Sequence, residues 1–182
     1  MASYRHLARI AVMQTLFAYQ FRNEKLPPDL ESNCKEFADK LTDLTFARDL
    51  LNGVIKHEKE IKELITKEAP EWPFERIALA DRVIISMGIY EILYSQDVPP
   101  IVAINEAIEI SKVFGDINSS KFVNGVLSTI MNKYKPEGAN RATPVKPHEP
   151  GEHNLKKTKS ARRAANIESA AKAKKPAAKK AK

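Results

Sequence analysis

Residues 80–94, with the sequence ADRVIISMGIYEILY, form the most apolar stretch of the 182-residue chain. A helix as apolar as this one is expected to be covered by its neighbours on most sides. We therefore predict a central helix from Ala80 to Tyr94. The flanking segments also show helical spacing and no strand-like alternation, so the chain is predicted to be all-α.

Three helical segments are predicted before the central one. The first runs from about residue 3 to residue 22, with apolar residues at 3.6-residue spacing on one side. After a pair of prolines a second stripe covers residues 30–41, and a third, long helical stretch from Phe46 is closed by Pro70. The inward positions predicted for the first helix are Leu7, Ile10, Ala11, Phe17, Ala18 and Phe21.

Two more helices are predicted after the central one. The proline pair at 99–100 favours a helix start, and Gly115 stands where a left-handed cap would end that helix. Asn118 or Ser119 is predicted to cap the last helix, which Pro136 ends.

Charge and apolar residues divide the chain after residue 135. Residues 136–182 carry 13 of the 30 basic residues but 4 of the 23 acidic ones, a net charge of +9, whereas residues 1–135 carry −2. All aromatic residues precede Pro136. A segment with so little to bury is expected to stay disordered when free. We predict a folded helical domain over residues 1–135 and a disordered Lys/Ala/Pro-rich basic tail over residues 136–182.

The composition favours a cytoplasmic protein. A single cysteine cannot form an internal disulfide. No apolar run reaches the roughly 18 residues that span a bilayer, and the first residues are typical of an amphipathic helix instead of a secretion signal. We expect no membrane association.

The sequence offers no residues suited to catalysis or to holding a metal or cofactor. His57 and Glu60 share a helix face without an evident third ligand, so we interpret them with Glu58 as a solvated charged face. Cys34 lies in an apolar stripe and is predicted to be a packed core thiol. The dispersed glycines exclude a glycine-rich phosphate loop.

The start of the first helix is a candidate phosphate-binding site. Arg5 and Arg9 are four residues apart on the face opposite Leu7, with His6 beside them. Cations in the first turns oppose the helix dipole, which costs up to about 1 kcal/mol, so stability does not explain them. Planar guanidinium groups on an exposed face suit phosphates. The alternative is a merely soluble face.

The start of the last helix is a second candidate. Here the helix N-terminus offers unpaired backbone N–H groups, Lys121 a charge, and Asn124 an amide able to read a base edge, with Asn118 beside them. Phe122 can stack on a base, but it is also in phase with Val126, which favours a core position.

Several strings of residues match a known family. They are FARDLLNGV at 46–54, DVP at 97–99, VAINEA at 102–107 and KFVNGVL at 121–127. With these strings the chain resembles the NusB family of bacterial transcription antitermination factors over residues 3–133, and the last two strings together make the resemblance specific. The basic tail lies outside it.

The resemblance implies an all-α fold of about seven helices in two small perpendicular bundles, without enzymatic activity. It also implies a partner, the small-subunit ribosomal protein NusE, with which the family binds boxA RNA of nascent ribosomal RNA transcripts and supports antitermination by RNA polymerase. For the free chain, a monomer and a homodimer both stay open. By this resemblance, the residues expected to contact RNA are Arg5, His6 and Arg9 of the first helix and Asn118, Lys121, Phe122 and Asn124 of the last.

The resemblance places the ribosomal-protein interface near Phe17 and the segment that contains Glu75, Asp81 and Arg82. Asp81 can pair with a basic residue of the partner, and truncating one half of a desolvated pair costs about 2–5 kcal/mol. The alternative is an acid that only complements the dipole of its own helix.

Two interpretations from other classes stay open. A NusB-like module also begins some ribosomal RNA cytosine methyltransferases, but no methyltransferase domain and no cofactor-binding glycine loop follows here. The other is a general nucleic-acid-binding protein driven by the tail, with the helical domain serving only for dimerisation. Removing residues 136–182 distinguishes the two, because specific boxA recognition should survive the deletion and general nucleic-acid binding should be lost.

Overall fold

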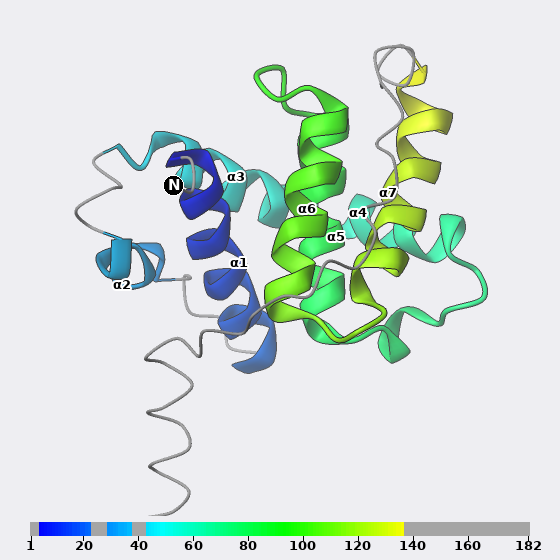
Figure 1. Ribbon diagram of the computed structural model, residues 1–182, viewed down its shortest axis with the longest axis horizontal. Coiled ribbons are helices and arrows are strands. Elements are labelled where there is room, and N and C mark those ends of the chain that lie inside the picture. Colours follow the sequence, from blue (N-terminus) through cyan, green and yellow to red (C-terminus); the bar gives the residue numbers. More distant parts are fainter. Residues whose placement is uncertain (1–3, 23–28, 38–42, 137–182) are drawn as a thin grey trace, which may run out of the picture. The chain divides into compact units, whose positions relative to one another are not determined.

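The computed structural model describes residues 4–22, 29–37 and 43–136. Within these ranges the chain forms α-helices and two 3₁₀ turns, Lys35–Phe37 and Phe74–Arg76, and no strand (Figure 1). The prediction of an all-α fold is confirmed for this part of the chain. The helices are α1 (Tyr4–Arg22), α2 (Leu30–Cys34), α3 (Thr45–Lys56), α4 (Glu58–Glu68), α5 (Leu79–Leu93), α6 (Pro100–Phe114) and α7 (Ser119–Tyr134).

Helix α5 lies at the centre of the helical domain, as its apolar sequence predicts. It packs against α1 and α3 and also against α4, α6 and α7. Every residue from Val83 to Ile89 is buried. Because helices from both halves of the domain pack on it, α5 joins a group formed by α1 to α3 to a group formed by α4 to α7, in agreement with the predicted NusB-like fold.

The third predicted helix is two helices, because the chain breaks at His57. This residue ends α3 and precedes α4, with φ −102° and ψ 14°. Its ring stacks on Tyr94 with centroids 4.0 Å apart, and its Nδ1 lies 3.0 Å from Glu60 Oε2. Glu58 and Glu60 are exposed as predicted, but His57 is half-buried. Within the described ranges no group of three or more metal-binding side chains occurs.

The junction of α6 and α7 differs from its prediction at Gly115. Its φ of −93° and ψ of −173° are extended, so the predicted left-handed cap is wrong. Glycine is needed because a Cβ would collide with the Ser119 side chain and the Ser111 carbonyl. Asn118 precedes α7 as predicted, but its side chain makes no capping hydrogen bond. Instead, Ser119 Oγ accepts a hydrogen bond from the Asp116 N–H at 2.8 Å.

A second glycine permits the close approach of α3 and α5. A Cβ added to Gly53 would overlap the ring of Tyr90. Cys34 is 5% exposed, which confirms the predicted core thiol, and burial raises the pKa of this thiol. None of the described helices is long and apolar enough to cross a membrane. The predicted tail, apart from Pro136, and the predicted helical residues 38–41 lie outside the described residues.

Candidate nucleic-acid and protein interfaces

The first turn of α1 presents Arg5 at the surface, as predicted. Its Nη1 donates a hydrogen bond to the main-chain oxygen of Asp97 at 3.1 Å, and its guanidinium lies 5.1 Å from the centroid of the Phe46 ring. An exposed cation over an aromatic face gains about 0.5–1 kcal/mol. Both contacts orient the side chain without neutralising its charge, so Arg5 can still bind a phosphate.

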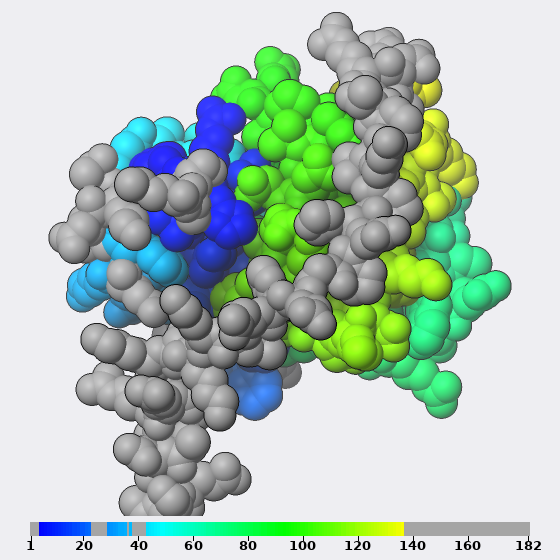
Figure 2. Space-filling model, in the orientation of Figure 1, coloured from blue at the N-terminus to red at the C-terminus, as the bar shows by residue number. Residues whose placement is uncertain are grey.

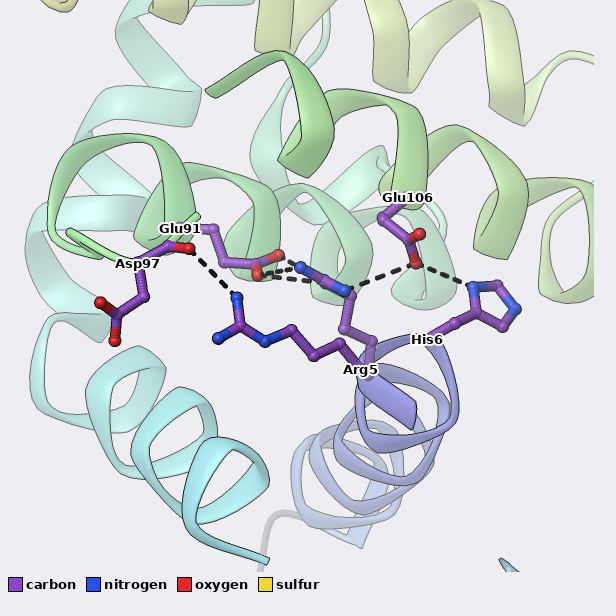
Figure 3. A network of polar contacts seen from close by, with 6 residues as sticks. Arg5, His6, Glu91, Asp97 and Glu106 are labelled. Carbon is purple, nitrogen blue, oxygen red and sulfur yellow. Dashed lines mark hydrogen bonds and ion pairs between the residues drawn. The ribbon is translucent and has the colours of Figure 1, made fainter. Parts of the chain in front are cut away.

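Arg9 is only 2% exposed, and the prediction that it faces solvent beside Arg5 is wrong. Its Nε and Nη2 donate to the Glu91 carboxylate at distances between 2.7 and 3.0 Å, and its Nη1 lies 3.5 Å from Glu106 Oε2 (Figure 3). The physical reason is that α1 packs against α2, α3 and α5, and Arg9 lies with Leu7 and Ala8 in the buried part of the helix.

Glu91 of α5 is the buried acid that Arg9 neutralises. Burial raises the pKa of the Glu91 carboxyl, and the hydrogen bonds and charge of Arg9 act in the opposite direction. Removing one member of a buried ion pair costs about 3–5 kcal/mol, because the other charge is left unpaired. The structure therefore gives Arg9 a role in holding α1 against α5.

His6 extends this network toward the surface. Its Nδ1 lies 2.8 Å from Glu106 Oε2, so one carboxylate oxygen of α6 contacts both His6 and Arg9. Figure 3 shows the Glu106 side chain reaching from α6 toward the first turns of α1. The network fixes the start of α1 against α6, with Arg5 exposed and His6 half-buried at its edge.

The predicted residues at the start of α7 are mostly exposed. Asn118, Lys121 and Asn124 are exposed, whereas Phe122 is half-buried. Lys121 makes no ion pair with any described residue. Asn124 Oδ1 accepts a hydrogen bond from Ser128 Oγ at 3.1 Å. In contrast to the α1 site, no buried charge holds these side chains in place.

Trp72 is a neighbour of this site that the sequence analysis did not single out. Its ring meets Phe122 edge-on, with centroids 5.6 Å apart and planes at 61°, and 54% of the residue is exposed. Phe122 also packs against the core, so the predicted core position is partly right. Both rings line a groove of about 690 Å³ together with Asn118 and Lys121. The feature of the sequence that could have identified Trp72 is that it is a lone tryptophan in a turn with two prolines.

Helix α6 separates the two candidate RNA-contacting regions. Glu106 on one flank of α6 contacts α1, and on the other flank Ser111 lies next to α7, with its Oγ 2.9 Å from Ser120 Oγ. Figure 2 shows α1 in blue, α6 in green and the start of α7 in lime across one face. The structure does not bring Arg5 and Lys121 into one pocket, so a ligand that touches both must cross α6.

Phe17, a predicted partner-binding residue, lies in an exposed aromatic pair. It is 36% exposed and stacks on Phe21, which is 74% exposed, with ring centroids 6.1 Å apart. The prediction that both rings point inward is wrong, because the buried part of α1 ends at Leu16. Phe21 is therefore an additional candidate for a protein contact.

The other predicted interface residues lie around the start of α5. Glu75 is exposed and accepts a hydrogen bond from Lys62 Nζ at 3.3 Å. Arg82 is half-buried, with its guanidinium 5.1 Å from the centroid of the Phe74 ring. These two charges flank Asp81, which differs from them in burial.

Asp81 is only 7% exposed, and its Oδ1 has no hydrogen-bond partner among the described residues. Burial raises the pKa of its carboxyl, and the nearby Ser119 hydroxyl acts in the opposite direction. Asp81 lines a pocket of about 270 Å³ with Trp72, Asp116 and Phe122. The predicted protein-binding acid thus adjoins the predicted RNA-binding start of α7.

Comparison with known proteins identifies relatives over most of the helical domain. Residues 6–132 match the model of the NusB family. The chain is 43% identical over 128 residues to the transcription antitermination protein NusB of Oceanobacillus iheyensis, covering 70% of this chain and 98% of that protein. The NusB protein of Geobacillus kaustophilus is 40% identical over 133 residues, covering 69% and 94%.

Solved structures agree with this match. T. maritima NusB is 34% identical and superposes with a TM-score of 0.64, covering 77% of this chain and 99% of that chain. A chain from a structure of the antitermination factors NusB and NusE in complex with dsRNA is 24% identical, with a TM-score of 0.61 over 74% and 100% of the two chains. At that identity the likeness concerns the fold alone.

Proposed function

The chain belongs to the NusB family of transcription antitermination proteins, and from this premise we propose that it binds boxA-type single-stranded RNA together with the small-subunit ribosomal protein NusE. The RNA is the leader of a nascent ribosomal RNA transcript, and the complex acts on the elongating RNA polymerase. This role places the protein in the cytoplasm and requires no catalytic residue, metal or cofactor.

The observation that carries the proposal is a pair of exposed cations on the two flanks of α6. Arg5 is oriented by Asp97 and Phe46 on one flank, and Lys121 lies at the start of α7 on the other. Cations that contact phosphates release counterions, which supplies much of the affinity for RNA. A single strand that crosses α6 can contact both regions.

The residues of the site divide into contacting and positioning groups. We assign a positioning role to Arg9, because it is buried in an ion pair with Glu91. Its contribution to RNA binding is to hold the start of α1 in place. RNA contact is assigned to Arg5, His6, Asn118, Lys121, Phe122 and Asn124.

NusE is assigned to the surface that includes the Phe17–Phe21 stack and the start of α5. Exposed stacked aromatics are typical anchors of protein interfaces. The buried, unpaired Oδ1 of Asp81 suits a basic side chain entering its pocket, with Glu75 and Arg82 at the edge. The same aromatic pair is available to a second copy of the chain when NusE is absent.

The proposal is tested by binding the full chain to purified NusE and then to boxA and scrambled RNA. We expect a stable complex that prefers boxA. Equal affinity for the two RNAs would contradict specific recognition of boxA. Failure to bind NusE would contradict the proposed partner.

Deleting the tail tests the proposed domain boundary, because the tail supplies charge but no aromatic residues. Thirteen basic residues against four acidic ones in residues 136–182 attract phosphate but cannot stack on bases. Deleting the tail should weaken boxA and scrambled RNA by similar factors at low salt, and the effect should fade toward about 0.5 M salt. A much larger loss for boxA would make the tail part of recognition.

A further inference from the structure

The groove beside α7 has two walls of different character. One wall is formed by Asn118, just before α7, and by Lys121, Phe122, Gly125 and Thr129 on one face of α7. The opposite wall is the segment 68–72, which ends in Trp72. The volume of the groove, about 690 Å³, lies in the roughly 300–1,000 Å³ range of small-molecule sites. The groove is therefore large enough for one nucleotide unit.

Trp72 is held in a fixed place yet remains half-exposed. The main-chain N–H of Trp72 donates a hydrogen bond to the Ala69 carbonyl at 3.0 Å, and prolines at 70 and 73 restrict the turn on both sides. The edge-on contact with Phe122 leaves 54% of Trp72 accessible. An exposed indole on a rigid turn is a preformed stacking surface.

The charges around the groove favour a nucleotide over an apolar peptide. Lys121 is exposed at its edge and has no acidic partner among the described residues. Glu68, on the opposite wall, is already engaged by Lys133 Nζ at 2.8 Å and by the Tyr134 hydroxyl at 2.7 Å, and these hydrogen bonds lower its pKa. Glu71 is exposed and able to accept hydrogen bonds from the amino group of a base.

From these features we infer that the groove binds one unpaired nucleobase of the RNA, stacked on Trp72, with its phosphate at Lys121. The inference rests on the proposed function and extends the RNA surface from the start of α7 to the segment before α5. Stacking on aromatic side chains is how proteins hold single-stranded bases with little sequence preference. Trp72 also lines the Asp81 pocket, so it separates the nucleobase from the basic group assigned to that pocket.

Gly125 supplies a way to block the groove without disturbing the core. A Cβ added there meets no atom within 4 Å. Alanine at this position adds little volume, whereas leucine extends into the groove, and both residues favour a helix over glycine. Gly125→Leu and Gly125→Ala are therefore a blocking variant and its matched control.

The experiment uses the full chain, in which Trp72 is the only tryptophan and the sole source of indole emission. We titrate it with boxA-type RNA and, separately, with an abasic sugar-phosphate oligomer of equal length. RNA should quench the emission of Trp72, and the abasic oligomer should bind through charge without quenching. Trp72→Leu and Gly125→Leu should each weaken RNA binding about 5- to 150-fold, which is the range for one stacked base, and Gly125→Ala should bind like the wild type.

Three outcomes would overturn the inference. If RNA binds normally by anisotropy while Trp72 emission and the affinity of Gly125→Leu stay unchanged, the groove holds no base and the proposed function stands. If the Gly125→Leu variant loses NusE but keeps RNA, the groove is a protein-binding site. If the wild type with NusE binds neither boxA nor scrambled RNA, the proposed function fails together with the inference.

Discussion

The starts of α1 and of α7 both carry candidate RNA-binding residues but hold them differently. In α1, Arg9 and Glu91 form a buried ion pair, and Glu106 joins Arg9 to His6. At the start of α7, Asn118 and Lys121 are exposed at a groove that Trp72 and Phe122 also line. Substitution of the buried Arg9 therefore affects stability and binding together, whereas the exposed residues at the start of α7 allow binding to be changed alone.

The largest expected effect is that of Arg9→Ala on stability. The substitution leaves the Glu91 carboxylate buried without its partner, so we expect a loss of about 3–5 kcal/mol in the free energy of unfolding, measured with denaturant. The double variant Arg9→Met, Glu91→Leu should recover most of this loss. If Arg9→Ala is as stable as the wild type, the ion pair with Glu91 does not stabilise the fold, and Arg9 is again a candidate for RNA contact.

Asp81→Asn tests the acid next to α7. Burial raises the pKa of Asp81, so its charge does not stabilise the fold, and removing it should leave the free energy of unfolding unchanged or slightly higher. Affinity for NusE should fall by about 2–5 kcal/mol, the cost of truncating a desolvated pair. Titration calorimetry with purified NusE measures this, and unchanged affinity would remove Asp81 from the interface.

The two glycines Gly53 and Gly125 form a matched pair. Gly53→Ala drives a Cβ into the ring of Tyr90 and should destabilise the protein by about 1–3 kcal/mol. Gly125→Ala enters open space and should stabilise it by up to about 1 kcal/mol. Thermal unfolding of both variants checks the contrast, and equal effects would contradict the packing described at α3 and α5.

The Arg9→Ala variant should also show a stronger dependence of stability on pH than the wild type. Burial already raises the pKa of Glu91 in the wild type, and without Arg9 this rise is no longer opposed, so the folded variant binds a proton more readily than the folded wild type. Its stability should therefore increase as the pH falls toward about 4.3, by at most about 1.4 kcal/mol per pH unit from this group. Unfolding curves between neutral and mildly acidic pH measure the free energy of unfolding of both proteins. If the difference between variant and wild type does not change with pH, Glu91 is not the group that titrates.

Helical periodicity predicted most of the fold because it depends on local spacing. It could not place Arg9, since the residue that buries it, Glu91, is 82 positions away. The break at His57 was hidden because apolar spacing continues through it into α4, while the stacking on Tyr94 that accompanies it is a tertiary contact. Trp72 became a candidate only when folding brought it next to Phe122.

The most direct test of the account is the salt dependence of boxA RNA binding by an Arg5→Ala, Lys121→Ala double variant in the presence of NusE. Both residues are exposed, so the free energy of unfolding should change by less than about 1 kcal/mol. Loss of two phosphate contacts should flatten the log–log salt slope by about 1.4 and weaken binding at low salt. A wild-type slope and affinity would contradict the claim that RNA contacts both flanks of α6.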